Sequence, residues 1–141
     1  MKVLIGVDDS SFSQAAVKSV AERQWKAGTQ IKIVSAVDTP VYDGLREENN
    51  QYEIARKVVD HAIETLRQSQ NQFELSGDII EGTPKEVLLD EAEKWGAELI
   101  VVGSHGRRGL NRFLLGSVSQ AVALHAKCSV EIVRDCAAKA T

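Results

Sequence analysis

The sequence has little cysteine and proline and no long hydrophobic run, and these shortages exclude several kinds of protein. The two cysteines, Cys128 and Cys136, form no CxxC pair and no metal-ligand spacing, so we expect a buried strand thiol and a tail thiol rather than a redox pair. The apolar run at residues 3–7 is too short for a membrane span or a signal-peptide core. We therefore expect a cytoplasmic protein that does not act at a membrane.

The sequence also lacks an excess of positive charge. Its 17 Lys and Arg residues against 20 Asp and Glu residues give a net charge of −3, so non-specific binding to nucleic acid is not expected. A chain of 141 residues with 43% apolar residues is long enough to bury one hydrophobic core. We predict a single domain over residues 1–141.

Apolar runs alternate with amphipathic stretches along the chain. Strands are predicted at residues 2–7, 31–37, within 73–80, at 99–102 and at 129–133. The first helix is predicted to run to about Ala27 and to end at Gly28, and a polar connection over residues 38–50 leads to the second. The third begins with a capping box at residues 83–86 and ends at Gly96, and the fourth covers residues 117–125. The second helix is predicted to share one apolar face among Tyr52, Ala55, Val59, Ala62 and Leu66.

This alternation predicts an α/β fold, a doubly wound parallel sheet with helices on both faces. Five strands with one reversal favour the order 3-2-1-4-5, which places the first and fourth strands side by side. Ligands of such sheets bind at this switch point, beyond the carboxyl ends of the strands. Asp8 follows the first strand and Gly103 follows the fourth, so both are expected to border one crevice.

A glycine pattern after the fourth strand is the most informative motif. Gly103 and Gly106 are followed, after nine residues, by Gly116 and Ser117. Glycine lets backbone amides approach an anion, and a helix N-terminus adds unpaired N–H groups, so the segment is typical of a phosphate-binding loop. Its spacing is neither that of the dinucleotide fingerprint nor that of the P-loop. Alternatively, Ser117 and Gln120 form a capping box that only begins the last helix.

The glycine segment also carries cationic and polar side chains. Arg107, Arg108 and Arg112 could bind phosphate oxygens, or they could be solvated loop charges. His105 could position a phosphate or take part in acid–base chemistry, and no partner for a catalytic triad is evident from the spacing.

Asp8 is the strongest single candidate outside that segment. A carboxylate at the end of the first strand can bind a ribose hydroxyl, or hold a phosphate-bound Mg²⁺ through water. Alternatively, Asp8, Asp9 or Ser10 caps the first helix, and these roles are compatible because three polar residues are present. Ala36 and Val37 end the second strand, where the topology lets them frame a planar base.

With these residues in place, the chain resembles the universal stress protein family, and specifically its ATP-binding branch. Gly103, Gly106, Gly116 and Ser117 match the family pattern G-x2-G-x9-G-[ST], and the opening KVLIGVDDS resembles the family's first strand and aspartate turn. The resemblance implies the adenine nucleotide alpha hydrolase-like fold with the strand order given above. It also implies ATP, with AMP or ADP as other possible ligands, and Mg²⁺ or Mn²⁺ accompanying the phosphates.

The resemblance also implies roles for individual residues. Asp8 would contact the ribose, and Ala36 and Val37 would face the adenine. The phosphates would lie against the glycine segment, from Gly103 to Gly106 and at Gly116, Ser117 and Ser119. The full set of residues implied for nucleotide binding is Gly6, Val7, Asp8, Ala36, Val37, Val102, Gly103, His105, Gly106, Arg107, Gly116, Ser117, Val118 and Ser119.

The function that the resemblance implies is a stress-response regulatory module with at most slow ATP hydrolysis. No residue is assigned a catalytic role, because the sequence offers no evident base and no P-loop lysine. Two alternatives remain: a slow metal-dependent ATPase or nucleotidyl-transfer enzyme that uses Asp8, and a nucleotide-independent protein-interaction module.

Members of this family often form homodimers through the last strand. Here Lys127 precedes that strand and Glu131 lies within it. Two Glu131 side chains would approach each other in a twofold pairing, which is unfavourable unless they reach solvent or a cation. We therefore expect a dimer of lowered affinity.

Overall fold

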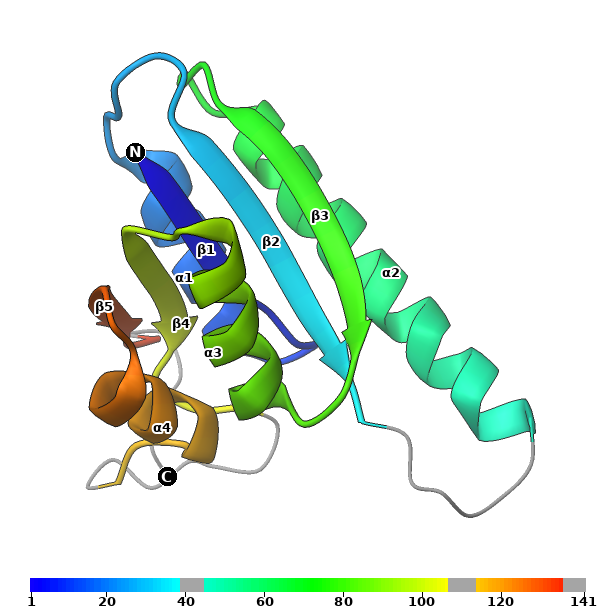
Figure 1. The fold of residues 1–141 in the computed structure, drawn as a ribbon. Helices are drawn as coiled ribbons and strands as arrows, with labels where there is room; N and C mark the ends of the chain where they lie inside the picture. The colour runs from blue at the N-terminus through cyan, green and yellow to red at the C-terminus, as the bar shows by residue number, and fades with distance from the viewer. Residues whose placement is uncertain (39–44, 107–113, 136–141) are drawn as a thin grey trace.

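The computed structural model describes residues 1–38, 45–106 and 114–135. Its five strands form one parallel sheet in the order β3-β2-β1-β4-β5, with four helices connecting them (Figure 1). This confirms the predicted fold class and strand order. In chain order the elements are β1 (Lys2–Gly6), α1 (Ser11–Glu22), β2 (Gln30–Val37), α2 (Leu45–Arg67), β3 (Glu74–Glu81), α3 (Pro84–Trp95), β4 (Leu99–Gly103), α4 (Ser117–His125) and β5 (Ser129–Val133).

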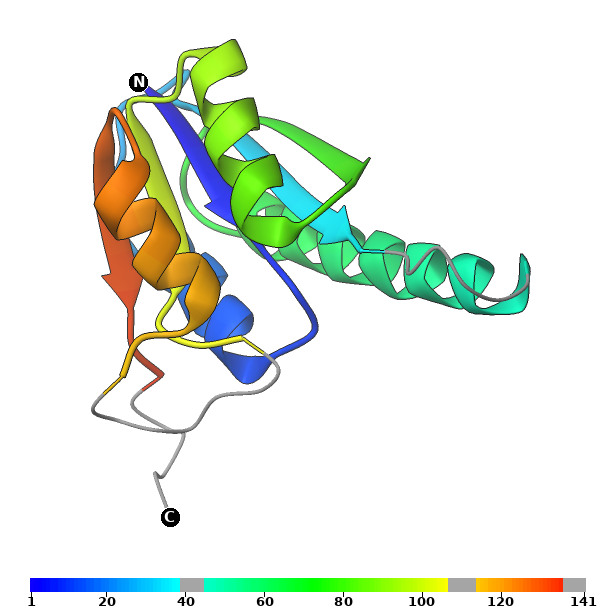
Figure 2. The same ribbon diagram turned by 60° about the horizontal axis from the view of Figure 1, so that its bottom comes forward.

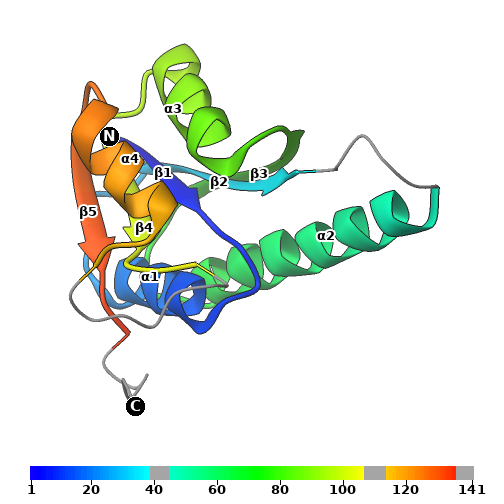
Figure 3. The ribbon, with the colours of Figure 1, turned by 90° about the horizontal axis from the view of Figure 1, so that it is seen from below.

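The central strand β1 is buried on both faces, as expected for a parallel sheet covered by helices. Val3, Leu4 and Ile5 are fully buried, and Ile5 lies in register with Ile33 of β2 and Val101 of β4. Helices α1 and α2 cover one face of the sheet, and α3 and α4 cover the other (Figure 3).

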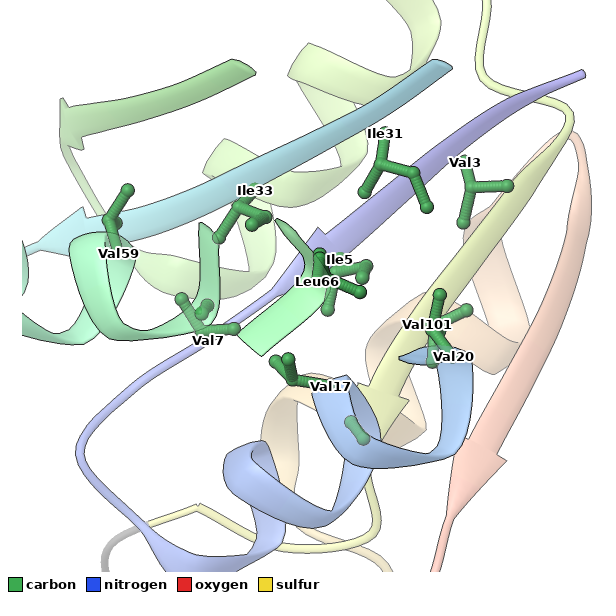
Figure 4. Packing of buried hydrophobic residues seen from close by; sticks show 12 residues of the cluster. Val3, Ile5, Val7, Val17, Val20, Ile31, Ile33, Val59, Leu66 and Val101 are labelled. Atoms are coloured by element: carbon green, nitrogen blue, oxygen red, sulfur yellow. The ribbon is translucent and has the colours of Figure 1, made fainter. Parts of the chain in front are cut away.

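Each face has its own hydrophobic core because successive strand residues point to opposite sides. Figure 4 shows the core on the α1 and α2 side, where Val3 and Ile5 of β1 meet Val17 of α1 and Leu66 of α2. The core on the other side joins Leu4 of β1 to residues of α3 and α4. Strands β1 and β4 are hydrogen-bonded neighbours and both contribute to the two cores, so their carboxyl ends lie side by side.

The first helix ends earlier than predicted, at Glu22 rather than about Ala27. Arg23 is extended, the Trp25 indole N–H donates to the Val20 carbonyl at 2.8 Å, and the Trp25 amide donates to Asn71 Oδ1 at 2.9 Å. These contacts hold residues 23–25 in a path that does not continue the helix. Gly28 therefore lies in the next turn, at φ +85°, and does not cap the helix.

The second helix begins at Leu45, inside the stretch predicted to be a polar connection, and the rest of that connection at residues 39–44 lies outside the described residues. The N-terminal end of α2 extends beyond the sheet (Figure 3). Ala55, Val59, Ala62 and Leu66 are buried as predicted, whereas Tyr52 is exposed. Tyr52 lies too near the projecting end to be covered.

The predicted boundaries of the third helix are confirmed, with Pro84 in its first turn and Gly96 in the left-handed conformation at its end. The predicted capping box does not form, because Thr83 makes no side-chain capping bond. Cys128 lies immediately before β5 and is partly buried, and this burial raises the pKa of its thiol. Cys136 lies outside the described residues.

Strand β5 is the edge of the sheet next to β4. Glu131, at the middle of β5, forms an ion pair with Arg23, with 2.9 Å between Arg23 Nη1 and Glu131 Oε2. The chain thus supplies its own cation to the carboxylate that was expected to disfavour pairing. In the described part of the chain, no helix is long and apolar enough to cross a membrane.

Candidate nucleotide-binding site

A cavity of about 120 Å³ lies at the carboxyl ends of β1 and β4. Figure 2 shows the N-terminal end of α4 and the segment after β4 at the same end of the sheet as the end of β1. Every predicted site residue that the structure describes lines this cavity, except Val37, and Arg107 lies outside the described residues. The lining comprises Gly6, Val7, Asp8, Ser13, Val34, Ala36, Pro84, Leu88, Val102, Gly103, His105, Gly106, Gly116, Ser117, Val118 and Ser119.

The two residues expected to frame a base point to opposite faces of β2. Ala36 lines the cavity with Val34, two residues before it on the same face. Val37 is buried, does not line the cavity, and its carbonyl accepts a hydrogen bond from the Gly82 amide. Pro84 and Leu88 of α3 complete an apolar wall with Val34 and Ala36.

Asp8 and Ser13 form a closed ring of hydrogen bonds at the start of α1. The Asp8 amide donates to Ser13 Oγ at 2.8 Å, and the Ser13 hydroxyl donates to Asp8 Oδ1 at 2.9 Å. The Ser10 amide also donates to Oδ1, at 2.9 Å. Ser10 itself caps α1 by accepting from the Ser13 amide. Capping therefore belongs to Ser10, and Asp8 keeps a second carboxylate oxygen.

That second oxygen, Oδ2, faces the glycine segment. A Cβ atom at Gly106 would lie 3.0 Å from Asp8 Oδ2. Among the described residues, no hydrogen bond involves Oδ2. A carboxylate oxygen that no described residue engages therefore lies at the border of the cavity, next to a residue that has no side chain.

The other two motif glycines permit close approach of backbone segments. A Cβ atom at Gly103 would lie 2.7 Å from the backbone of Phe12, so this glycine lets α1 pack against the end of β4. A Cβ atom at Gly116 would lie 3.0 Å from the Cα atom of His105. The Gly116 amide donates to the Ser104 carbonyl at 2.8 Å. Gly116 thereby brings the two ends of the glycine segment together.

The N-terminus of α4 opens into the cavity. Gly116 is its N-cap, and no side chain caps the helix. Within the described chain, the amides of Ser117, Val118 and Ser119 have no hydrogen-bond acceptor, as expected in a first helical turn. Ser117 is the first helical residue and its exposed hydroxyl forms no capping bond. The capping-box alternative for Ser117 and Gln120 is therefore wrong.

Ser119 differs from Ser117 in its surroundings. Its side chain is 1% exposed, and its hydroxyl lies 2.9 Å from the Ser104 carbonyl and 3.0 Å from the Gly116 carbonyl. This hydroxyl would have to leave both carbonyls before it could reach a phosphate. In this structure it fastens α4 to the segment that follows β4.

His105 joins the two ends of the glycine segment. Its Nε2 atom hydrogen-bonds the Leu114 carbonyl and its Nδ1 atom lies 3.0 Å from Ser104 Oγ. A carbonyl only accepts, so Nε2 carries the proton and Nδ1 accepts from the Ser104 hydroxyl. The ring also contacts Phe12, with 5.1 Å between ring centroids. Both ring nitrogens are thus engaged by protein groups, which argues against the acid–base role considered from the sequence.

Two further observations concern the arginines of the predicted site and the metal ligands. Arg107, Arg108 and Arg112 lie outside the described residues. Among the residues with described positions, no three His, Cys, Asp or Glu side chains gather in a group that could hold a metal ion.

Sequence reasoning missed Ser13, although the spacing Asp8, Ser10, Ser13 after a buried strand could have indicated a hydroxyl within reach of the carboxylate.

Comparisons with known proteins show which family the chain is similar to. The universal stress protein family model matches residues 1–134. A universal stress protein of Methanocaldococcus jannaschii is 30% identical over 138 residues, covering 94% of this chain and 81% of the relative. The crystal structure of a universal stress protein in complex with cAMP shares 25% identity at a TM-score of 0.66, over 95% of this chain and 96% of the other.

A protein of the same family from Arabidopsis thaliana, solved with AMP bound, has a TM-score of 0.70 over 97% of this chain and 93% of the other. At 19% identity, that likeness shows the shared fold. The family model covers nearly the whole chain. This chain belongs to the universal stress protein family.

Proposed function

We propose that this chain binds ATP in the cavity between β1 and β4 and acts as a nucleotide-dependent regulatory module in the cytoplasm. One observation carries the proposal: Asp8 Oδ2 and the first amides of α4 border the same cavity, and among the residues that the structure describes neither has a hydrogen-bond partner. Asp8 Oδ2 can accept hydrogen bonds from sugar hydroxyls, and the α4 amides can donate hydrogen bonds to an anion. Relatives that bind cAMP and AMP support an adenine nucleotide as the ligand.

Each part of the nucleotide has a matching part of the cavity. The apolar wall of Val34, Ala36, Pro84 and Leu88 suits the adenine ring. Asp8 Oδ2 would accept from the ribose, and the α4 amides with the Ser117 hydroxyl would donate to the phosphates. In this proposal Ser119 holds α4 in place and does not contact the phosphates.

A divalent ion would arrive with the phosphates. Mg²⁺ commonly keeps several waters and binds one or two carboxylates together with phosphate oxygens. Asp8 is half-buried at the border of the cavity, so it could help to hold Mg²⁺ or Mn²⁺ through water. The ion would neutralise phosphate charge close to the carboxylate.

We propose binding rather than efficient turnover. His105 is the imidazole that lines the cavity, and both of its nitrogens are hydrogen-bonded by Ser104 and Leu114. It is therefore not poised to take a proton from a water molecule. Any hydrolysis would be slow.

Calorimetric titration of the nucleotide-free protein with ATP and Mg²⁺ tests the proposal. We expect one ATP per chain with a micromolar Kd, and a weakened affinity in Asp8→Asn because a neutral amide is a poorer acceptor for the ribose. Asp90→Asn is the matched control, since Asp90 is exposed on α3 and away from the cavity. Absence of binding heat at several temperatures would refute nucleotide binding and favour the interaction-module alternative.

We also propose that two copies pair along β5. The strand leaves one edge of the sheet uncovered within the described residues, and the Arg23–Glu131 ion pair offsets the charge at its centre.

A further inference from the structure

Ser13 is a buried polar residue that the nucleotide-binding proposal does not use directly. Its side chain is 6% exposed and lies in the first turn of α1, below Asp8. Its hydroxyl accepts from the Asp8 amide at 2.8 Å and donates to Asp8 Oδ1 at 2.9 Å. One hydroxyl thus hydrogen-bonds both the backbone amide and the carboxylate of Asp8.

This double contact fixes the orientation of the Asp8 carboxylate. Oδ1 receives two hydrogen bonds, one from Ser13 and one from the Ser10 amide. With Oδ1 held inside the turn, the planar carboxylate directs Oδ2 toward Gly106 and the cavity. An unrestrained aspartate would instead sample several rotamers, and it would lose that freedom only when the ligand binds.

We propose that Ser13 is a positioning residue for ribose recognition, which presents Asp8 Oδ2 to the sugar hydroxyls. The inference rests on the proposed function, because it concerns the same nucleotide. Ser13 acts through Asp8 and does not touch the ligand. It therefore sets how strongly the protein distinguishes a nucleotide with ribose hydroxyls from one without them.

A purely structural role for Ser13 makes a different prediction. Loss of the hydroxyl leaves the Asp8 amide without its acceptor, which would disturb the start of α1. A general disturbance of this kind would weaken every ligand of the cavity alike. Loss of carboxylate positioning would weaken only ligands whose ribose hydroxyls Asp8 contacts.

The experiment compares ATP with 2′,3′-dideoxy-ATP, each with Mg²⁺, by calorimetric titration. We expect Ser13→Ala to weaken ATP binding by about tenfold, the effect of losing one hydrogen bond to a charged group. The affinity for dideoxy-ATP should stay within about twofold of wild type. Ser11→Ala is the matched control, because Ser11 is exposed on the same helical turn, and both of its affinities should remain unchanged.

A second comparison isolates the route through Asp8. In an Asp8→Ala background there is no carboxylate to orient, so adding Ser13→Ala should not change the ratio of the two affinities further. If Ser13→Ala does not fold, Ser13→Cys replaces it, because a thiol is a weaker donor of similar shape. Its ratio should lie between those of wild type and Asp8→Ala.

The outcomes separate the inference from the function on which it rests. Equal losses for ATP and dideoxy-ATP in Ser13→Ala, or an unchanged affinity for both, would overturn the positioning role while leaving ATP binding established. A wild-type protein that binds neither nucleotide would overturn the proposed function, and the inference with it.

Discussion

Two hydroxyl groups orient the polar side chains of the cavity. Ser13 holds Asp8 Oδ1, and Ser104 donates to His105 Nδ1. Ser104 is 2% exposed, so its hydrogen bond is shielded from water. In both cases a small buried hydroxyl engages one polar atom of the neighbouring side chain, so the other polar atom is directed elsewhere. Oδ2 of Asp8 faces the cavity, and Nε2 of His105 reaches across to Leu114.

The first residue-scale prediction concerns His105. Replacement by Ala removes the bond to the Leu114 carbonyl and leaves the Ser104 hydroxyl without its acceptor, so the free energy of unfolding should fall by about 1–3 kcal/mol. The contact between Leu114 and the residues that follow β4 should also be lost, which would weaken ATP more than adenosine because only ATP has phosphates. Urea denaturation and titrations with both ligands measure these effects.

His125→Ala is the control for that experiment, since His125 is exposed at the end of α4 and does not line this cavity. It should leave both affinities unchanged. If His105→Ala weakened ATP and adenosine by the same factor, phosphate binding would not depend on the imidazole.

At the scale of elements, the contact between α1 and β4 depends on Gly103. A Cβ atom there would lie 2.7 Å from the backbone carbonyl of Phe12, which cannot rotate away as a flexible side chain could. We therefore expect Gly103→Ala to lower the free energy of unfolding by about 1–3 kcal/mol, the usual cost of overpacking. Urea denaturation measures the change.

The same substitution should move α1, and with it Asp8, away from the glycine segment. ATP affinity should therefore fall together with stability. Unaltered stability in Gly103→Ala would mean that the helix can retreat without cost and that the glycine is not required for packing.

The elements themselves show why sequence reasoning succeeded in some places and not in others. Four of the strands were predictable because each contains an apolar run, whereas β3, which includes Ser76, Gly77 and Asp78, could be placed only within residues 73–80. The ends of α3 follow the local signals Pro84 and Gly96. The end of α1 was not predictable, because Asn71, far along the chain, binds the Trp25 amide and draws the chain away.

The candidate site follows the same division. The motif glycines and Asp8 could be placed at one crevice from the strand order alone. The reason for Gly103 could not, because it is the backbone of Phe12 on another element. The direction of Val37 depends on the register of β2 with β3, and the burial of Ser119 depends on how α4 packs on Ser104. These properties arise only in the folded chain.

At the scale of the whole molecule, the edge strand β5 raises the question of assembly. In an antiparallel twofold pairing, Glu131 at the middle of β5 would lie near the axis, opposite its copy. Arg23, anchored next to α1, places its guanidinium 2.9 Å from the Glu131 carboxylate. Each copy would then bring an Arg23–Glu131 ion pair to the axis. The repulsion between the two Glu131 carboxylates would therefore be reduced but not abolished.

This arrangement predicts opposite effects for the two partners of the ion pair. Arg23→Gln should weaken the dimer by about two- to fivefold, since half-exposed ion pairs contribute about 0.2–1 kcal/mol and the two carboxylates would face each other uncompensated. Glu131→Val should strengthen the dimer, because it replaces a charge by a strand-favouring apolar side chain. Sedimentation velocity over a concentration series measures both, with Lys18→Gln as the exposed control. If neither substitution changed the dissociation constant of the dimer, the interface would lie away from β5, because Glu131 stands at the centre of that strand.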